Sequence, residues 1–120
     1  MLKNNFNLNK NYKSDEKNPL AVDLNGKTDI KNFDEGDIAE VTFTLFVFKN
    51  IDFEKAPFQI EITSEGIFTW NESVSKEELH NYLNYNAPSI LLSYIRSIVS
   101  MTTAYAGIPN FMIPLINFYK

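Results

Sequence analysis

The sequence predicts an α+β fold in which an antiparallel β-meander comes first and helices follow. Residues 40–48 and 58–63 alternate apolar and polar side chains, which is typical of strands with one buried face. Apolar residues in 75–107 recur at spacings of three and four, which is typical of helices. A chain of 120 residues has room for one core, so we expect a single domain. Its expected parts are 1–74 mainly β, 75–107 helical, and 108–120 an extended C-terminal tail.

Composition narrows the class of protein. With 44% apolar and 22% charged residues, the chain is ordinary globular material. The absence of cysteine excludes disulfides, thiolate metal ligands and thiol nucleophiles. A net charge of −4 without a basic stripe argues against nucleic acid as a partner. The start lacks the apolar segment of a secretory signal, and Pro109 and Pro114 interrupt the uncharged stretch 97–119. We therefore expect a cytoplasmic protein without membrane insertion.

The first strands are predicted from short alternating runs. Residues 6–12 place Phe and Leu between asparagines, as a half-buried strand does. Residues 20–24 also alternate and end at Asn25-Gly26, a dipeptide that by itself indicates a tight hairpin turn. The following residues, 27–33, have only a weak strand pattern and could form a second strand or a bulged extension.

The clearest strand is 40–48, EVTFTLFVF. One of its faces begins with threonines and ends with Phe46 and Phe48, and an exposed aromatic end of a sheet needs a partner. Residues 58–63 form a two-faced antiparallel strand, and Ser64-Glu65-Gly66 predicts a turn into the next strand. Together these segments predict the β-meander.

Capping residues delimit two helices. Ser75 followed by Glu78 is a capping-box pattern for a short helix. Asn86 is the expected N-cap of a long helix that has Pro88 in its first turn. Gly107 is expected to end this helix.

The long helix lacks a charged face. Of the 26 charged side chains, residues 81–120 contain only Arg96 and Lys120. We expect one broad buried side and a polar back that serves as an oligomer contact, an apolar groove or merely the solvated back of a core helix. The expected buried side comprises Ile90, Leu91, Tyr94, Ile95, Ile98, Val99, Met101 and Tyr105. The expected back comprises Ser89, Ser93, Arg96, Ser97, Ser100 and Thr103.

No pattern of catalysis accompanies these elements. His80 is the only histidine, and no G-x-S-x-G motif supplies a nucleophile for it. Phosphate-binding glycine motifs are missing, and the acidic residues around Gly36 do not follow the calcium-loop spacing. We expect no enzyme activity, no cofactor and no metal.

Three ordered motifs resemble the SecB family of protein-export chaperones. They are Gly66-Ile67-Phe68, then 86–98 with the sequence NAPSILLSYIRSI, and then Ile113-Pro114-Leu115-Ile116-Asn117-Phe118. The family shows, in the same order, a Gly-Ile-Phe strand, a C-P-x-x-L-F-P-Y-A-R helix start and a closing x-P-x-N-F. Residues 38–118 carry the resemblance, although Leu92-Ser93-Tyr94 replaces F-P-Y.

The resemblance implies a four-stranded antiparallel sheet with two helices packed on one face, assembled as a dimer of dimers. It also implies ATP-independent holding of unfolded or slow-folding polypeptides in apolar grooves, for delivery to the translocase ATPase. Many members engage that ATPase through an acidic, metal-binding tail, which this sequence does not contain up to Lys120. Protection of a dedicated client, such as the antitoxin of a toxin–antitoxin pair, is the alternative within the family. A non-chaperone oligomeric adaptor is the alternative outside it.

Site residues follow from both arguments. By position in the family, Tyr94 and Phe118 belong to the client groove, and Ile60 and Ile62 to positions that support assembly. The residue patterns add groove residues Phe46, Phe48, Leu91 and Met112. They also add interface residues Ser93, Ser97 and Ser100 to a homo-oligomer, expected to be a tetramer. The resemblance places Gln59 and Glu61 on an open sheet face toward the translocase ATPase.

Overall fold

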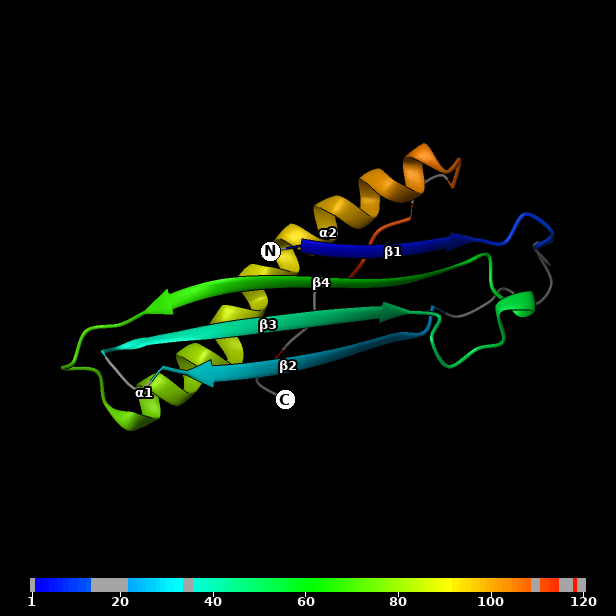
Figure 1. The fold of residues 1–120 in the computed structure, drawn as a ribbon. Helices are drawn as coiled ribbons and strands as arrows, with labels where there is room; N and C mark the ends of the chain where they lie inside the picture. The colour runs from blue at the N-terminus through cyan, green and yellow to red at the C-terminus, as the bar shows by residue number, and fades with distance from the viewer. Residues whose placement is uncertain (1, 14–21, 34–35, 109–110, 115–117, 119–120) are drawn as a thin grey trace.

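The structure, a computed structural model, describes residues 2–13, 22–33, 36–108, 111–114 and 118. A four-stranded antiparallel sheet is crossed on one face by a long helix (Figure 1), so the α+β class is confirmed. The strands are β1 (Leu2–Leu8), β2 (Leu24–Asn32), β3 (Ile38–Val47) and β4 (Phe58–Thr69). The helical part comprises α1 (Lys76–Asn81), a π-helical turn (Tyr82–Asn86) and α2 (Ala87–Tyr105), while a short 3-10 turn (Phe53–Lys55) precedes β4.

The strand order is β1-β4-β3-β2. Strands β2, β3 and β4 form the predicted meander, but β1 pairs with β4 and not with β2, so the meander prediction is wrong for the first strand. In β1, Phe6 lies opposite Ile60, and its ring is 5.8 Å from that of Phe58. This aromatic contact gives β1 an apolar anchor at the far edge of the sheet.

The Asn25-Gly26 turn prediction is also wrong, because both residues lie inside β2, where Gly26 pairs with Leu45. A Cβ atom at Gly26 would lie 2.8 Å from Cζ of Phe43. Glycine is therefore required here for the space that the phenyl ring occupies. Residues 20 and 21 of the predicted run lie outside the described residues.

Strand β4 is one continuous strand of 12 residues, and the turn predicted at Ser64-Glu65-Gly66 does not occur. These three residues pair with Val41–Phe43 of β3. A Cβ atom at Gly66 would lie 2.9 Å from Cε2 of Phe68 and 3.3 Å from Cδ2 of Leu91. Gly66 thus marks the place where α2 approaches the sheet closely.

The core lies between one face of the sheet and α2. Every second residue of β3 is buried, as the alternating sequence predicts. The buried side chains of β3 are Ala39, Val41, Phe43, Leu45 and Val47, and those of α2 include Leu91, Leu92, Ile95 and Val99. The tail completes this layer: Ile113 is 1% exposed and its carbonyl oxygen accepts a 2.8 Å hydrogen bond from Arg96 Nε.

The helical run is continuous where the sequence predicts a new start. Asn86 has helical φ and ψ angles and makes no side-chain capping bond, so its predicted N-cap role is wrong. Instead, the Ala87 N–H donates to the Tyr82 carbonyl five residues earlier. A proline inside an α-helix clashes with the carbonyl four residues before it. The wider π-helical turn gives Pro88 room at the start of α2 without a break.

The outer ends of the helical run follow the sequence. Ser75 Oγ accepts a 3.1 Å hydrogen bond from the Glu78 N–H, which confirms the N-terminal cap. Gly107 ends the run with a φ of 84°, and Ile108 N–H donates to Thr103 O at 2.9 Å. However, α1 has no buried residue. Within the described residues, the helix that covers the sheet is α2, and two packed helices are not confirmed.

Candidate functional site

Phe48 is a core residue, contrary to the groove prediction. Strand alternation would turn it toward the open face, but its φ of 58° breaks the alternation at the end of β3, and the residue is only 3% exposed. This left-handed conformation is rare for a bulky residue. The Phe48 N–H donates to Asp23 O at 2.8 Å, and its ring meets that of Phe58 edge-on at 5.3 Å. These contacts hold the residue in the core.

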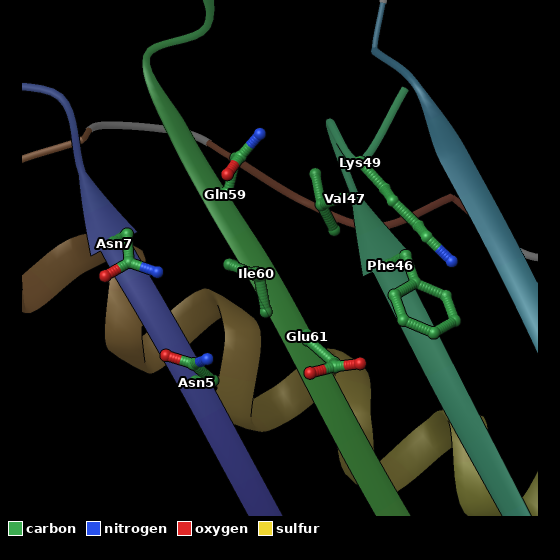
Figure 2. A pocket seen from close by; sticks show the side chains of 8 residues that line it. All are labelled: Asn5, Asn7, Phe46, Val47, Lys49, Gln59, Ile60 and Glu61. Atoms are coloured by element: carbon green, nitrogen blue, oxygen red, sulfur yellow. The ribbon is translucent and has the colours of Figure 1, made fainter. Parts of the chain in front are cut away.

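Phe46 lies on the opposite sheet face, away from α2. Its cross-strand neighbour on β4 is Glu61, and the Lys49 ammonium lies 4.0 Å from its ring centroid. These side chains, which Figure 2 shows on neighbouring strands, border a hollow with a volume of about 310 Å³. The hollow is lined by Asn5, Asn7, Phe46, Val47, Lys49, Gln59, Ile60 and Glu61. The six predicted groove residues therefore do not form one groove, because Phe46 belongs with the residues predicted to face the translocase.

Gln59 and Glu61 share this open face, as predicted, but differ in what they do there. The Gln59 amide donates to the Phe48 carbonyl at 3.1 Å and to the Ile51 carbonyl at 3.2 Å, so it holds the loop between β3 and β4. Glu61 is exposed. Of the two, Glu61 is the side chain offered to solvent.

Ile60 and Ile62 do not fit the predicted interface role. They are 3% and 0% exposed and lie in the core on the sheet face that α2 covers. The alternation of 58–63 correctly predicts one buried face. What buries that face is the chain's own helix, so neither side chain can reach a second copy.

The exposed side of α2 carries an apolar stripe that the sequence pattern assigned to the core. Its members, hereafter the helix stripe, are Ile90, Tyr94, Met101 and Tyr105, with exposed fractions of 44, 62, 54 and 86%. Leu91 is buried in the core at 3%, and Thr103, expected on the polar back, is only 1% exposed. The helix is apolar on two sides, so spacing alone could not tell which side faces the sheet.

The predicted interface serines flank the helix stripe. Ser93 Oγ donates to Ile90 O at 2.6 Å, and Ser97 Oγ lies 3.5 Å from Ser93 O. Because such hydroxyls can bond to the carbonyls of their own helix, they leave a small surface without charge. Ser93 and Ser97 are exposed, and Ser100 is half-buried and shares a hollow with Phe111 and Met112 near the start of the tail.

Two apolar hollows are lined in part by described residues of the tail. The larger, of about 620 Å³, separates the last turns of α2 from the tail and is called the tail cleft below. Its lining is Ser100, Thr103, Ala104, Gly107, Ile108, Phe111 and Met112. The smaller, of about 360 Å³, is lined by Leu24, Asn25, Gly26, Thr28, Phe43 and Phe118.

Of the predicted groove residues, Met112 and Phe118 lie at these hollows. Met112 is 69% exposed, whereas Phe118 is half-buried with its ring edge-on to Phe43 at 5.4 Å. The sequence analysis missed Phe111 and Ile108. The uncharged stretch 97–119 was the signal that could have indicated them.

The described part of the chain has no group of three or more His, Cys, Asp or Glu side chains that could hold a metal ion. Among the same residues, no helix has both the length and the hydropathy needed to cross a membrane.

The described residues thus form a helix-backed antiparallel sheet with apolar hollows beside the residues that follow the helix. Residues 4–120 match the family model described as preprotein translocase subunit SecB, and the chain belongs to the SecB family, as the motifs predicted. The function that goes with this assignment is that of a chaperone for protein export.

Individual relatives agree with the assignment. The chain is 32% identical over 103 residues to the protein-export protein SecB of Neisseria gonorrhoeae, covering 86% of this chain and 69% of that protein. It is 29% identical over 104 residues to SecB of Aromatoleum aromaticum, covering 87% and 64%. A Mycobacterium tuberculosis SecB-like chaperone, solved with a ChAD peptide from the HigA1 antitoxin, superposes with a TM-score of 0.63. That match covers 96% of this chain and 81% of the other at 14% identity, and it shows a shared fold.

Proposed function

We propose that this SecB-family chain is an ATP-independent holdase that binds unfolded or slow-folding polypeptides in the tail cleft. The observation that carries the proposal is the exposure of Met112 beside a hollow of about 620 Å³ in a stretch without charged side chains. An unfolded polypeptide presents apolar segments, and burying them releases roughly 25 cal/mol per Å² of apolar surface. Binding of this kind needs neither ATP nor a fixed client sequence.

Assembly strengthens this mechanism. One cleft gives weak binding, whereas several clefts on one particle engage several segments of the same chain and raise the overall affinity. The helix stripe is the surface we propose for assembly into a dimer of dimers. Four large apolar side chains are exposed there, and Ser93 and Ser97 beside them allow another helix to approach without desolvating a charge.

The open sheet face is the proposed contact with the translocase ATPase. Glu61 is exposed on this face, and Phe46 lies next to it on β3. An acidic group beside an aromatic ring suits a partner surface with a basic residue and an apolar one. This part of the proposal is separate from client binding, because the two surfaces lie on opposite sides of the sheet.

A dedicated client is the second candidate. The structural neighbour was solved with a peptide from an antitoxin, which shows that this fold can hold one particular partner in that protein. For this chain, a dedicated client would be displaced only by the same sequence. A general holdase would be displaced equally by unrelated unfolded polypeptides, and a competition assay separates the two.

The solution mass tests the proposal. Light scattering measures the protein alone and after addition of a permanently unfolded polypeptide at low micromolar concentration. We expect a mass of four subunits that rises by about one client chain. An oligomer whose mass ignores the unfolded chain would contradict holding and would favour a permanent oligomeric adaptor.

A further inference from the structure

A fourth hollow lies at the other end of the helical run from the tail cleft. Figure 1 shows this end, where β4 leads into α1. Its volume is about 510 Å³. The lining residues are Thr69, Trp70, Asn71, Val74, Glu78, Asn81, Tyr82 and Asn86. None of the predicted client, interface or translocase residues is among them.

Two aromatic residues, Trp70 and Tyr82, line this hollow and have contacts outside it. The backbone N–H of Trp70 donates to the Asp37 carbonyl at 3.2 Å, which fixes the backbone at the end of β4. The Tyr82 ring meets Phe68 edge-on, with centroids 6.0 Å apart. Both rings are half-buried, so each keeps part of its surface open.

The π-helical turn shapes the same hollow. Tyr82 and Asn86, its first and last residues, both line it. Single π-helical turns occur frequently at functional sites, because the wider turn aims side chains where an α-helix would not. The cap on Ser75 fixes the backbone of Glu78 across the hollow, through the bond to its N–H.

The charge of the hollow selects its ligand. Glu78 is the only charged residue among the eight that line it, and none of them is basic. A guanidinium group stacks on aromatic rings and pairs with a carboxylate through two parallel N–H bonds. Its remaining N–H groups suit the side-chain amides of Asn71 and Asn81. An ammonium group would use the carboxylate but could not stack in this way.

We propose that this hollow binds the arginine side chain of a polypeptide held by the protein, with Trp70 and Tyr82 as stacking surfaces and Glu78 as the ion-pair partner. The inference deepens the proposed function, on which it rests for the polypeptide that carries the arginine. An anchor at this end of the helical run, far from the tail cleft, makes a client span the length of α2. Client segments with an arginine well separated from an apolar stretch are then preferred.

Trp70 provides a direct readout because it is the only tryptophan in the chain. The full-length protein is titrated with N-acetylarginine amide, and with N-acetylcitrulline amide as a neutral probe of the same shape, at equal ionic strength. We expect a saturable change in tryptophan fluorescence with the arginine probe alone. A lysine probe should bind more weakly than the arginine probe.

Two matched variants locate the charge. Glu78→Gln should weaken arginine binding about three- to tenfold, which is the size of an exposed ion pair supporting a cation–π contact. Glu77→Gln removes the neighbouring carboxylate, which does not line the hollow, and should leave binding unchanged. Far-UV circular dichroism checks that both variants keep their helix.

Equal responses to arginine and citrulline on the unaltered protein would overturn the proposal, whatever the variants do. Equal losses in the two variants would also overturn it, because they would reflect only the general negative field. The mass titration with an unfolded polypeptide is an independent measurement. Binding of that polypeptide without an arginine response would overturn this inference and leave the holdase function standing.

Discussion

Leu91 of α2 packs over Gly66 of β4 so closely that a Cβ atom on the glycine would lie 3.3 Å from Cδ2 of the leucine. The two residues belong to separate sequence motifs, Gly66-Ile67-Phe68 and the start of the long helix. In the folded chain these motifs are two sides of one contact. The two motifs therefore contain the residues through which α2 packs on the sheet.

The first prediction concerns this contact. Gly66→Val should lower the free energy of unfolding by about 2 kcal/mol, because an extra branched side chain must displace Phe68 and Leu91 in a packed core. Urea denaturation at fixed protein concentration measures the change. Thr69→Val, at an exposed position of the same strand, is the control and should stay within about 0.5 kcal/mol. A fully stable Gly66→Val protein would show that α2 can move away from the sheet at little cost.

The second prediction compares adjacent residues of α2. Leu91→Ala should cost about 2–5 kcal/mol of unfolding free energy, because it leaves a cavity in the core. Ile90→Ala should leave the fold intact and weaken the oligomer, because Ile90 belongs to the exposed helix stripe. Denaturation and sedimentation velocity measure the two effects. An unchanged oligomer in Ile90→Ala and in Tyr94→Ala would remove the stripe from the proposed interface.

The third prediction concerns the tail cleft. Met112→Glu should reduce affinity for an unfolded polypeptide about tenfold or more, because a bound apolar segment would bury an unpaired carboxylate. The side chain is exposed, so fold and oligomer mass should not change. Fluorescence anisotropy of a labelled unfolded polypeptide measures the affinity. Met112→Leu serves as the control and should bind normally, and equal binding by the Glu variant would place the client elsewhere.

The fourth prediction tests the open sheet face. Glu61→Lys should abolish binding to the translocase ATPase in a pull-down with purified components, since it reverses the exposed charge beside Phe46. Client affinity should remain unchanged, because the tail cleft lies on the other face. Glu72→Lys makes the same charge change in the exposed loop after β4 and is the matched control. Loss of ATPase binding in both variants would indicate a net-charge effect.

Alternation predicted the strands well where it was uninterrupted. The buried residues of β3 and of 58–63 are those that the alternation of apolar and polar side chains predicts, because successive side chains of a strand point to opposite faces. The errors cluster at Gly26 and Gly66, where glycine makes room for Phe43 and Leu91 and forms no turn. A sequence does not distinguish these two uses of glycine, because the side chain that needs the space is distant in the chain.

The candidate site was harder to predict than the fold. In a helix with apolar residues on two sides, the spacing does not tell which side is buried. The position of the sheet decides that Leu91 is buried while Ile90 and Tyr94 are exposed. Phe48 reached the core through a left-handed backbone that strand alternation cannot anticipate. The pair Ala87-Pro88 looked like a helix start, because a π-helical turn leaves no signature that separates it from a cap.

Arg96 has an unusual position for its charge. It is the only charged side chain between residues 81 and 119, and its Nε donates to the Ile113 carbonyl. The Arg96 guanidinium therefore connects α2 to the tail by a hydrogen bond. The bond lies about one helical turn before Ser100 and one residue after Met112, both of which line the tail cleft, so it ties helix and tail together next to the cleft. If clients bind in the tail cleft as proposed, this bond would restrict how far the tail can move away from the helix, and the size of a client side chain would then matter as well as its hydrophobicity.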